Sequence, residues 1–310
     1  MKACVIGGNG FIGSHLVDGL RQAQWDVVVF DRVDERFRAR LQDVEYIFGD
    51  LSDRDLLAEA LSGVDVVFHL AYTTIPQTSN NDPTFDVRTN VLDFIGLLEV
   101  CVKVNVPRVI FLSSGGTVYG IPSQTPVPEN HPTDPISSYG ITKLAIEKYL
   151  ALFKRLYGIE YTVLRPANPF GERQNPEGDQ GALTVFLGKI ARGLPIVIWG
   201  DGTVIRDYIY VGDLVDACLA ALSVKSGYRV FNIGSGQGIS LNQLIETISR
   251  AIPAKFNVEY KEGRIFDVPE LVLDVSRAKY HLNWSARTSL EDGIKRTWEW
   301  IQTLDSTRKD

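Results

Sequence analysis

The chain has 310 residues, and its 38 acidic against 32 basic residues give a formal net charge of −6, with 45% of residues hydrophobic. These values predict a globular enzyme of two unequal lobes, and the acidic balance excludes an extended nucleic-acid-binding surface. No apolar run has the length needed to cross a bilayer, so we expect no membrane partner. Three cysteines, an odd number set within apolar patterns, favour reduced thiols and a cytoplasmic location.

A glycine-rich turn follows the first apolar segment, residues 3–6. Glycines at position 7 or 8, then 10 and 13, match the dinucleotide fingerprint in either reading, although an ordinary turn between strand and helix is the alternative. Such a turn lets the backbone approach a pyrophosphate, and a helix beginning near Phe11 would direct its first amides at that anion. We therefore predict that a dinucleotide cofactor contacts Gly7, Gly10, Phe11, Ile12 and Gly13.

Asp31 ends the second expected strand, about 20 residues beyond the glycines, where an acid binds the adenosine ribose. Its carboxylate would repel a 2′-phosphate by about 4 kcal/mol at a separation of about 4 Å. The sequence therefore predicts NAD rather than NADP as cofactor. Arg32 offers the alternative, because its guanidinium could pair with a 2′-phosphate.

Apolar, β-branched segments recur at residues 3–6, 27–30, 44–48, 64–70, 108–113 and 161–165, with helical patterns between them. This alternation predicts an α/β fold with a doubly wound parallel sheet of Rossmann type. Beyond Pro166 the pattern is less regular, with a loop over 168–181 and short strands at 196–199 and 204–210. We expect a cofactor-binding domain over residues 1–166 and a smaller mixed α/β substrate lobe over 167–310, the chain crossing between them in part.

Two expected helices, residues 86–104 and 138–157, carry more apolar surface than one sheet face requires. The first has two neighbouring apolar stripes, and the second has four large apolar side chains to bury, Leu144, Leu150, Phe153 and Leu156. We predict that both helices form a four-helix interface in a homodimer. The alternative is that the chain's own segments cover them.

Tyr139 and Lys143 lie four residues apart on the second of these helices, so both side chains project from one face. A lysine ammonium beside a phenol favours the phenolate, which lowers the tyrosine pKa and suits Tyr139 as a general base. The pair follows the fifth strand and its Ser113-Ser114 end, which places it near the nicotinamide. An exposed helix pair is the alternative.

Several motifs occur in an order that resembles the extended short-chain dehydrogenase/reductase family and, within it, the UDP-glucose (UDP-galactose) 4-epimerase branch. They are Gly7 to His15, Gly49-Asp50-Leu51, His69-Leu70-Ala71, Asn90, Thr117-Val118-Tyr119-Gly120, Tyr139-Gly140-Ile141-Thr142-Lys143, residues 164–171 and residues 200–208. The resemblance implies an NAD-dependent nucleotide-sugar 4-epimerase of carbohydrate metabolism and polysaccharide biosynthesis. A nucleotide-sugar reductase or dehydrogenase, and an NAD-binding protein with an idle site, remain alternatives.

The resemblance also implies roles for individual residues. Asp50 and Leu51 would line the adenine pocket, and further cofactor contacts would come from Leu70, Ala71, Tyr72, Asn90, Ser113, Lys143 and Pro166. The nucleotide diphosphate of the substrate would be held by Asn168, Trp199, Arg206 and Arg264. Arginines suit phosphate oxygens and an indole suits a base. The alternatives are Arg206 paired with Asp207, Arg264 paired with Asp267, and Trp199 in the core.

One departure from the family concerns the catalytic hydroxyl, since Gly115 stands where the family has Ser or Thr. On an extended strand end Thr117 shares the orientation of residue 115, so we predict that Thr117 supplies the hydroxyl, with Ser114 as the alternative. The lack of an acid at positions 116 and 117 argues against elimination or decarboxylation. Tyr72 replaces a residue that is small in the family and would narrow the nicotinamide side of the pocket. Leu271, of intermediate size, does not decide which sugar the pocket accepts.

Overall fold

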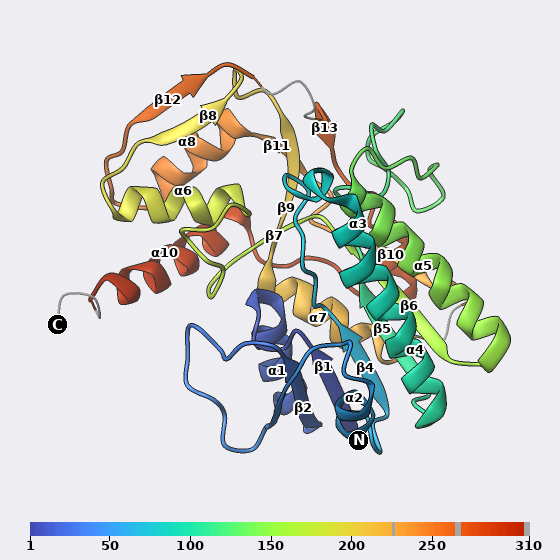
Figure 1. The fold of residues 1–310 in the computed structure, drawn as a ribbon. Helices are drawn as coiled ribbons and strands as arrows, with labels where there is room; N and C mark the ends of the chain where they lie inside the picture. Colours follow the sequence, from blue (N-terminus) through green and yellow to red (C-terminus); the bar gives the residue numbers. More distant parts are fainter. Residues whose placement is uncertain (225–226, 264–267, 307–310) are drawn as a thin grey trace.

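A seven-stranded parallel sheet forms the centre of the computed structural model, which describes residues 1–224, 227–263 and 268–306 (Figure 1). The strand order is β10-β6-β5-β4-β1-β2-β3. The strands are β1 (Lys2–Ile6), β2 (Asp26–Asp31), β3 (Glu45–Phe48), β4 (Val66–His69), β5 (Arg108–Leu112), β6 (Glu160–Pro166) and β10 (Val230–Ile233). Six of them match the expected apolar segments, and the doubly wound Rossmann-type fold is confirmed.

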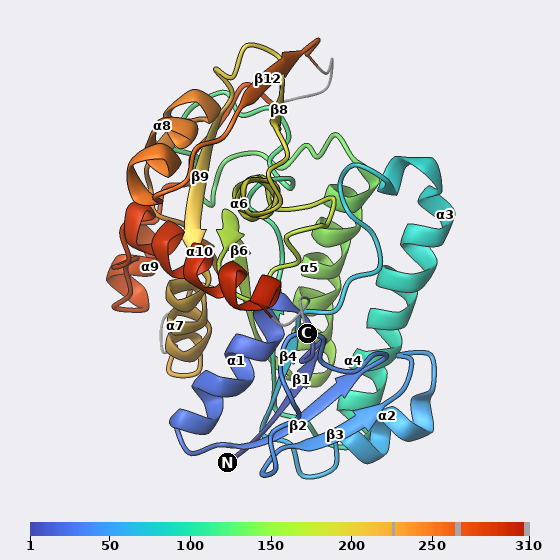
Figure 2. The ribbon, with the colours of Figure 1, turned by 90° about the vertical axis from the view of Figure 1, so that its left-hand side faces the viewer.

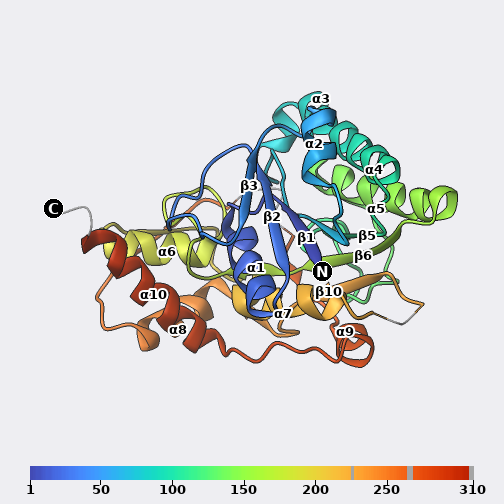
Figure 3. The same cartoon turned by 90° about the horizontal axis from the view of Figure 1, so that it is seen from below.

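Helices cover both faces of this sheet, as the view from below shows (Figure 3). The helices α1 (Phe11–Gln22) and α7 (Val211–Ala221) pack on one face, and α2 (Arg54–Ala60), α4 (Asp93–Lys103) and α5 (Ser138–Tyr157) pack on the other. Successive side chains of β1 enter opposite cores: Val5 packs with the α1 side and Ile6 with the α2 side. Burial on both faces explains why these strands read as continuous apolar runs.

The helix expected over residues 86–104 begins earlier and is not regular. It consists of α3 (Pro83–Asp86), a π-helical segment (Val87–Leu92) and α4. The predicted start at Asp86 is wrong, because Asp82 caps the helix and Pro83 occupies its first turn. The Asp82 side chain accepts a hydrogen bond from the Phe85 N–H at 2.9 Å. The helix expected over 138–157 has the predicted bounds.

A second layer of structure lies above the carboxyl ends of the sheet (Figure 2). Its strands are β7 (Asn168–Phe170), β9 (Ile205–Tyr210), β11 (Gly238–Ser240) and β13 (Glu270–Leu271) in one sheet, and β8 (Ile196–Trp199) and β12 (Val258–Lys261) in another. Around them pack α6 (Ala182–Ala191), α8 (Leu241–Ala251) and α10 (Leu290–Ser306), with their own apolar core. By contrast α7, β10 and α9 (Ser276–His281), all beyond residue 166, pack with the first sheet.

A partly buried ionic cluster ties the first helix to the loop after β7. Arg173 donates to the Asp18 carboxylate at 2.8 Å and to Nδ1 of His15 at 2.6 Å. Arg38 binds the same Asp18 and contacts Glu35 at 2.5 Å. Burial, with Arg173 nearby, lowers the pKa of His15 to about 4, so its imidazole is neutral and accepts that proton. The cluster holds α1, which follows the glycine turn, against the loop over 171–181.

All three cysteines, Cys4, Cys101 and Cys218, are buried free thiols, as their apolar surroundings predict. Burial raises the pKa of Cys101 and of Cys218 to about 12, so neither is a reactive thiolate at neutral pH. Within the part of the chain that the structure describes, no helix combines the length and apolar character that a membrane span requires.

Candidate active site

A cavity of about 830 Å³ opens at the carboxyl ends of the central strands. It is lined by the glycine turn, the ends of β4, β5 and β6, the start of α5 and the loop over 174–181. None of the described residues that line it is acidic, whereas Lys143 and Arg206 are basic. A cavity of this size and charge suits anionic ligands, although the chain as a whole is acidic.

The glycine turn has the geometry of a pyrophosphate cradle. Gly7 adopts a left-handed φ of +82°, and a Cβ on Gly13 would lie 2.1 Å from the Gly7 carbonyl oxygen. Gly10 is the N-cap of α1 and supplies no side-chain cap, so the first amides of that helix face the cavity without a competing side chain. The residues present therefore fit a dinucleotide, as the fingerprint predicts.

Asp31 joins the glycine turn to β2 rather than lining this cavity. Its carboxylate accepts hydrogen bonds from the Asn9 N–H at 3.0 Å and from the Arg32 N–H at 2.7 Å. The Arg32 guanidinium pairs with the Asp50 carboxylate at 3.7 Å. This pairing weakens the alternative in which Arg32 is set aside for a 2′-phosphate.

Tyr139 and Lys143 both line the cavity from α5, as their spacing predicts. The Lys143 ammonium is buried and donates to the Leu112 carbonyl at 2.7 Å, and its Nζ lies 5.6 Å from the Tyr139 ring centroid. Burial lowers the pKa of Lys143 to about 7, against the opposing effects of Glu147 and Asp86. The pair therefore combines a phenol with an ammonium that burial makes unusually acidic.

The expected lowering of the Tyr139 pKa by Lys143 is wrong for the protein alone. Burial raises the pKa of Tyr139, Asp86 raises it further, and a hydrogen bond from Ser114 offsets these effects in part. The ammonium turns toward the Leu112 carbonyl, so it does not compensate for desolvation of the phenolate. Deprotonation of Tyr139 thus calls for a further positive charge in the cavity.

The hydroxyls near Tyr139 sit in a turn, not on an extended strand. β5 ends at Leu112, and the N–H groups of Thr117 and Val118 donate to the Ser114 carbonyl at 3.3 and 3.2 Å. The prediction that Thr117 shares the orientation of residue 115 assumes an extended strand end, and this premise is wrong. Ser114 and Thr117 both line the cavity, but Ser114 is the one beside the Tyr139 phenol.

Gly115 itself points away from the cavity. A Cβ there would lie 2.6 Å from the Leu273 side chain and 3.0 Å from the Arg165 carbonyl oxygen. A serine or threonine at this position would therefore clash instead of presenting a hydroxyl. The buried Thr117 hydroxyl has no hydrogen-bond partner among the described residues, and a buried polar group left in this way needs a ligand or water.

Most predicted site residues converge on the cavity. Those that line it are Gly7, Gly10, Phe11, Ile12, Gly13, Leu70, Tyr72, Ser113, Ser114, Thr117, Tyr139, Lys143, Pro166, Asn168 and Arg206. The remaining described ones lie outside its lining: Asp31, Arg32, Asp50, Leu51, Ala71, Asn90 and Trp199. Arg264 lies outside the described residues.

Two of the residues outside the lining, Asn90 and Trp199, have contacts that the structure defines. The Asn90 amide is engaged within the protein, since it accepts from the Thr73 N–H at 3.1 Å and donates to Asp86 at 2.8 Å. It supports the wall of the site instead of pointing into it. Trp199 is 42% exposed, with the Lys261 ammonium 5.8 Å from its ring, so the alternative of a core position is wrong.

Sequence reasoning missed several polar residues that line the cavity, among them Thr74, Gln77, Asn80, Gln174 and Gln180. They belong to the loops after β4 and β7, far apart in the sequence. No spacing rule connects them to the glycine turn, because only the folded arrangement of the loops brings them to one cavity.

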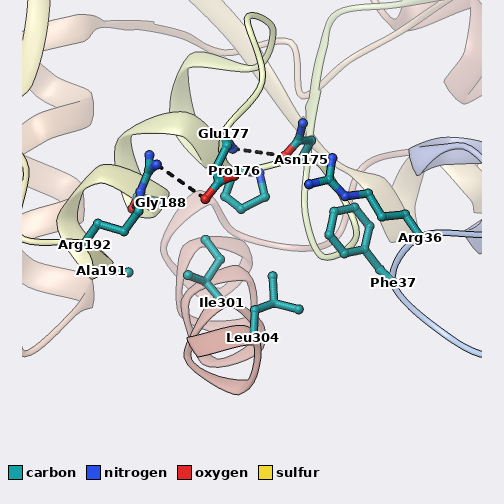
Figure 4. Close-up of a pocket in the computed structure, with 10 residues that line it drawn as sticks. All are labelled: Arg36, Phe37, Asn175, Pro176, Glu177, Gly188, Ala191, Arg192, Ile301 and Leu304. Atoms are coloured by element: carbon teal, nitrogen blue, oxygen red, sulfur yellow. Dashed lines mark hydrogen bonds and ion pairs between the residues drawn. The ribbon is translucent and has the colours of Figure 1, made fainter. Parts of the chain in front are cut away.

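A second cavity, of about 30 Å³, lies between the loop after β2 and α10 (Figure 4). Arg36 and Phe37 approach it from one side, Ala191 and Arg192 lie on the opposite side, and Ile301 and Leu304 from α10 lie below it. This volume is about that of one water molecule. It excludes a nucleotide ligand, so the candidate active site is the larger cavity.

The fold and the larger cavity define an enzyme of the Rossmann type, with a dinucleotide cradle beside a tyrosine and lysine pair. Comparison with known proteins agrees: the model of the NAD dependent epimerase/dehydratase family matches residues 3–234. The chain belongs to this family.

Individual relatives match along almost the whole chain. The UDP-glucose 4-epimerase of Mycolicibacterium smegmatis is 36% identical over 311 residues, covering 97% of this chain and 99% of the relative. The structure of UDP-glucose 4-epimerase with UDP-glucose from Thermotoga maritima superposes with a TM-score of 0.93 at 37% identity, covering 98% and 99%. That of the Thermus thermophilus UDP-glucose 4-epimerase with NAD gives 0.89 at 30% identity, covering 97% and 99%.

Proposed function

We propose that this protein is an NAD-dependent nucleotide-sugar 4-epimerase whose substrate is a UDP-hexose. The observation that carries this proposal is a single cavity, free of acidic residues among those described, that joins the glycine turn to Tyr139 and extends to Asn168 and Arg206. The relatives that bind NAD and UDP-glucose support the same ligands for this chain.

The reaction inverts C4 of the sugar through a transient 4-keto intermediate. The glycine turn and Lys143 would hold NAD, which would supply reversible hydride transfer at C4 and a positive charge in the cavity. The phenol of Tyr139, in its ionised form, takes the proton of the C4 hydroxyl and gives it back to the returning alkoxide. Lys143 would hold the nicotinamide ribose beside Tyr139, and Arg206 and Asn168 would hold the diphosphate at the far end of the cavity.

Two hydroxyls complete the chemistry beside the base. Ser114, which hydrogen-bonds Tyr139, relays or donates a proton at the C4 oxygen. Thr117, whose buried hydroxyl has no partner among the described residues, orients a sugar hydroxyl from the opposite side of the turn. Each role satisfies a polar group that desolvation would otherwise leave without a partner, at a cost of about 1 to 3 kcal/mol.

Cofactor retention and turnover test the proposal together. We expect protein purified without added cofactor to release NAD(H) on denaturation, because the glycine turn fits a pyrophosphate and the Asp31 carboxylate lies beside that turn. Incubated with a panel of UDP-, dTDP- and GDP-hexoses and no added NAD, it should interconvert a UDP-hexose with its 4-epimer. Net oxidation or reduction of cofactor with each sugar turned over would instead indicate a reductase. Bound NAD with no turnover would indicate an idle site.

Substitutions of the two hydroxyls give a matched comparison. We expect Ser114→Ala to lower kcat by about 10²-fold, since it removes a proton relay from the base. Thr117→Val keeps nearly the same shape and should mainly raise KM, since its hydroxyl orients the sugar. Steady-state assays of both variants distinguish these effects. The assignment fails if Thr117→Val abolishes turnover while Ser114→Ala leaves it unchanged.

The chain is further proposed to act in the cytoplasm as a homodimer through α4 and α5. Both helices cover the sheet, yet Leu92, Ile141, Leu152 and Leu156 in and beside them are exposed. Burying such side chains in a partner removes apolar surface from water. Light scattering of the purified protein is expected to give the mass of two chains, and the mass of one chain would contradict the interface.

A further inference from the structure

A buried carboxylate, Asp86, lies behind the wall of the cavity and has no exposed surface. Its Oδ1 accepts hydrogen bonds from the Thr74 hydroxyl at 2.6 Å and the Asn90 amide at 2.8 Å. Its Oδ2 accepts from the hydroxyls of Ser138 at 2.6 Å and Thr142 at 3.2 Å. Among the described residues no Lys, Arg or His pairs with it, so neutral donors alone hold this charge.

The donors come from three segments that shape the site. Thr74 lies in the cavity-lining loop after β4, Asn90 in the π-helical segment, and Ser138 and Thr142 on α5. Ser138 immediately precedes Tyr139, and Thr142 immediately precedes Lys143. The carboxylate therefore fixes the turn of α5 that carries the base against the opposite wall of the cavity.

Thr142 extends the same network into the cavity. Its hydroxyl oxygen lies 2.5 Å from the Tyr72 phenol oxygen. The Tyr72 ring lies edge-on to Tyr139, with centroids 4.8 Å apart, and its centroid is 3.9 Å from Nζ of Lys143. Through Thr142, Asp86 thus also positions the aromatic ring that packs against both reacting side chains.

The other titratable groups facing the pair are neutral or compensated. Glu147 faces Lys143 but is paired with Arg165 at 2.5 Å. Burial lowers the pKa of His69 to about 3, and burial raises that of Tyr72, so both are uncharged at neutral pH. Asp86 is therefore the uncompensated negative charge near the pair, and it raises the pKa of both Tyr139 and Lys143.

We propose that Asp86 is a positioning residue of this active site, which holds Tyr139 and Lys143 in place and sets, through its charge, the pH range in which they react. The inference rests on the proposed function, because it assigns the base to Tyr139. Removing the negative charge favours the phenolate and disfavours the ammonium, so both groups should lose their protons at lower pH.

Asp86→Asn tests the inference, with Asp82→Asn as the matched control. Asp82 is the exposed N-cap of the same short helix, and asparagine caps equally well. In NAD-loaded Asp86→Asn, ultraviolet titration of tyrosinate, with Tyr139→Phe subtracted, should show Tyr139 ionising at lower pH. Both limbs of the profile of kcat against pH should shift to lower pH. At the pH where the parent is most active, kcat should fall by up to about 10²-fold. The control should match the parent.

A folded Asp86→Asn protein with an unchanged tyrosinate titration and pH profile would overturn the inference. If that variant fails to fold, Ser138→Ala and Thr74→Val remove single donors; each should lower kcat more than it changes KM, and unchanged kcat in both would overturn it. The titration needs no sugar. A parent protein that binds NAD but epimerises nothing would therefore refute the proposed function while leaving this readout decisive.

Discussion

Tyr139→Phe is expected to keep the fold and the bound NAD but to lose about 10² to 10⁴-fold in kcat, the usual contribution of a general base. Phenylalanine retains the ring, which packs edge-on against Tyr72 at 4.8 Å, and loses only the hydroxyl that Ser114 approaches. The other ionisable side chains among the described residues that line the cavity do not replace it: Lys143 is bound to the Leu112 carbonyl, burial raises the pKa of Tyr72, and the Arg206 guanidinium stays protonated.

Tyr149→Phe is the matched control for this substitution. Tyr149 lies on the same helix, is partly buried and packs against the apolar core between helix and sheet, outside the lining of the cavity. Its variant should retain the parent's kcat, KM and NAD content. If Tyr139→Phe also stays within a few-fold of the parent in steady-state assays, another group removes the proton and the assignment of the base is refuted.

The sheet could be predicted from sequence wherever its strands are buried by apolar side chains on both faces, as with β1 and β2. β10 escaped prediction because its four residues include Asn232, a polar side chain that is nonetheless fully buried. Asn232 accepts from the Tyr119 hydroxyl at 2.7 Å and donates to the Val127 carbonyl at 2.8 Å. These partners lie about a hundred residues away in the sequence, so no local pattern predicts the strand.

In the candidate site, too, local motifs could be predicted from sequence, whereas contacts between distant segments could not. The glycine turn and the Tyr139/Lys143 pair are local motifs, so their spacing alone predicts that their side chains or amides share a face. The choice between Ser114 and Thr117 was not local, because it depends on where β5 ends and a turn begins. Asp86 was read only as the start of an amphipathic helix, since its four donors are assembled by the fold.

Gly13→Ala is expected to abolish NAD retention and to destabilise the protein. A methyl group on Gly13 would lie 2.1 Å from the Gly7 carbonyl oxygen and 2.8 Å from the Gly8 Cα, both of them backbone atoms. Neither can rotate away as a side chain would, and Gly7 itself is held at a φ of +82°, where an added Cβ would lie 2.7 Å from the Ala71 backbone N. Overpacking of this kind costs about 1 to 3 kcal/mol or more, which lowers Tm by on the order of 5 °C.

Gly10→Ala separates the steric role of the turn from its ligand-binding role. Gly10 has an ordinary φ of −78°, and a methyl group there would lie 3.3 Å from the Gly7 oxygen, so the fold should tolerate it. The methyl group would nonetheless occupy the surface that the pyrophosphate must approach. We expect Gly10→Ala to keep the Tm of the NAD-free parent but to lose NAD, and Gly13→Ala to lose NAD and to melt below the NAD-free parent, as measured by calorimetry and by cofactor release. Equal NAD content in Gly10→Ala and the parent would show that the pyrophosphate does not bind at this turn.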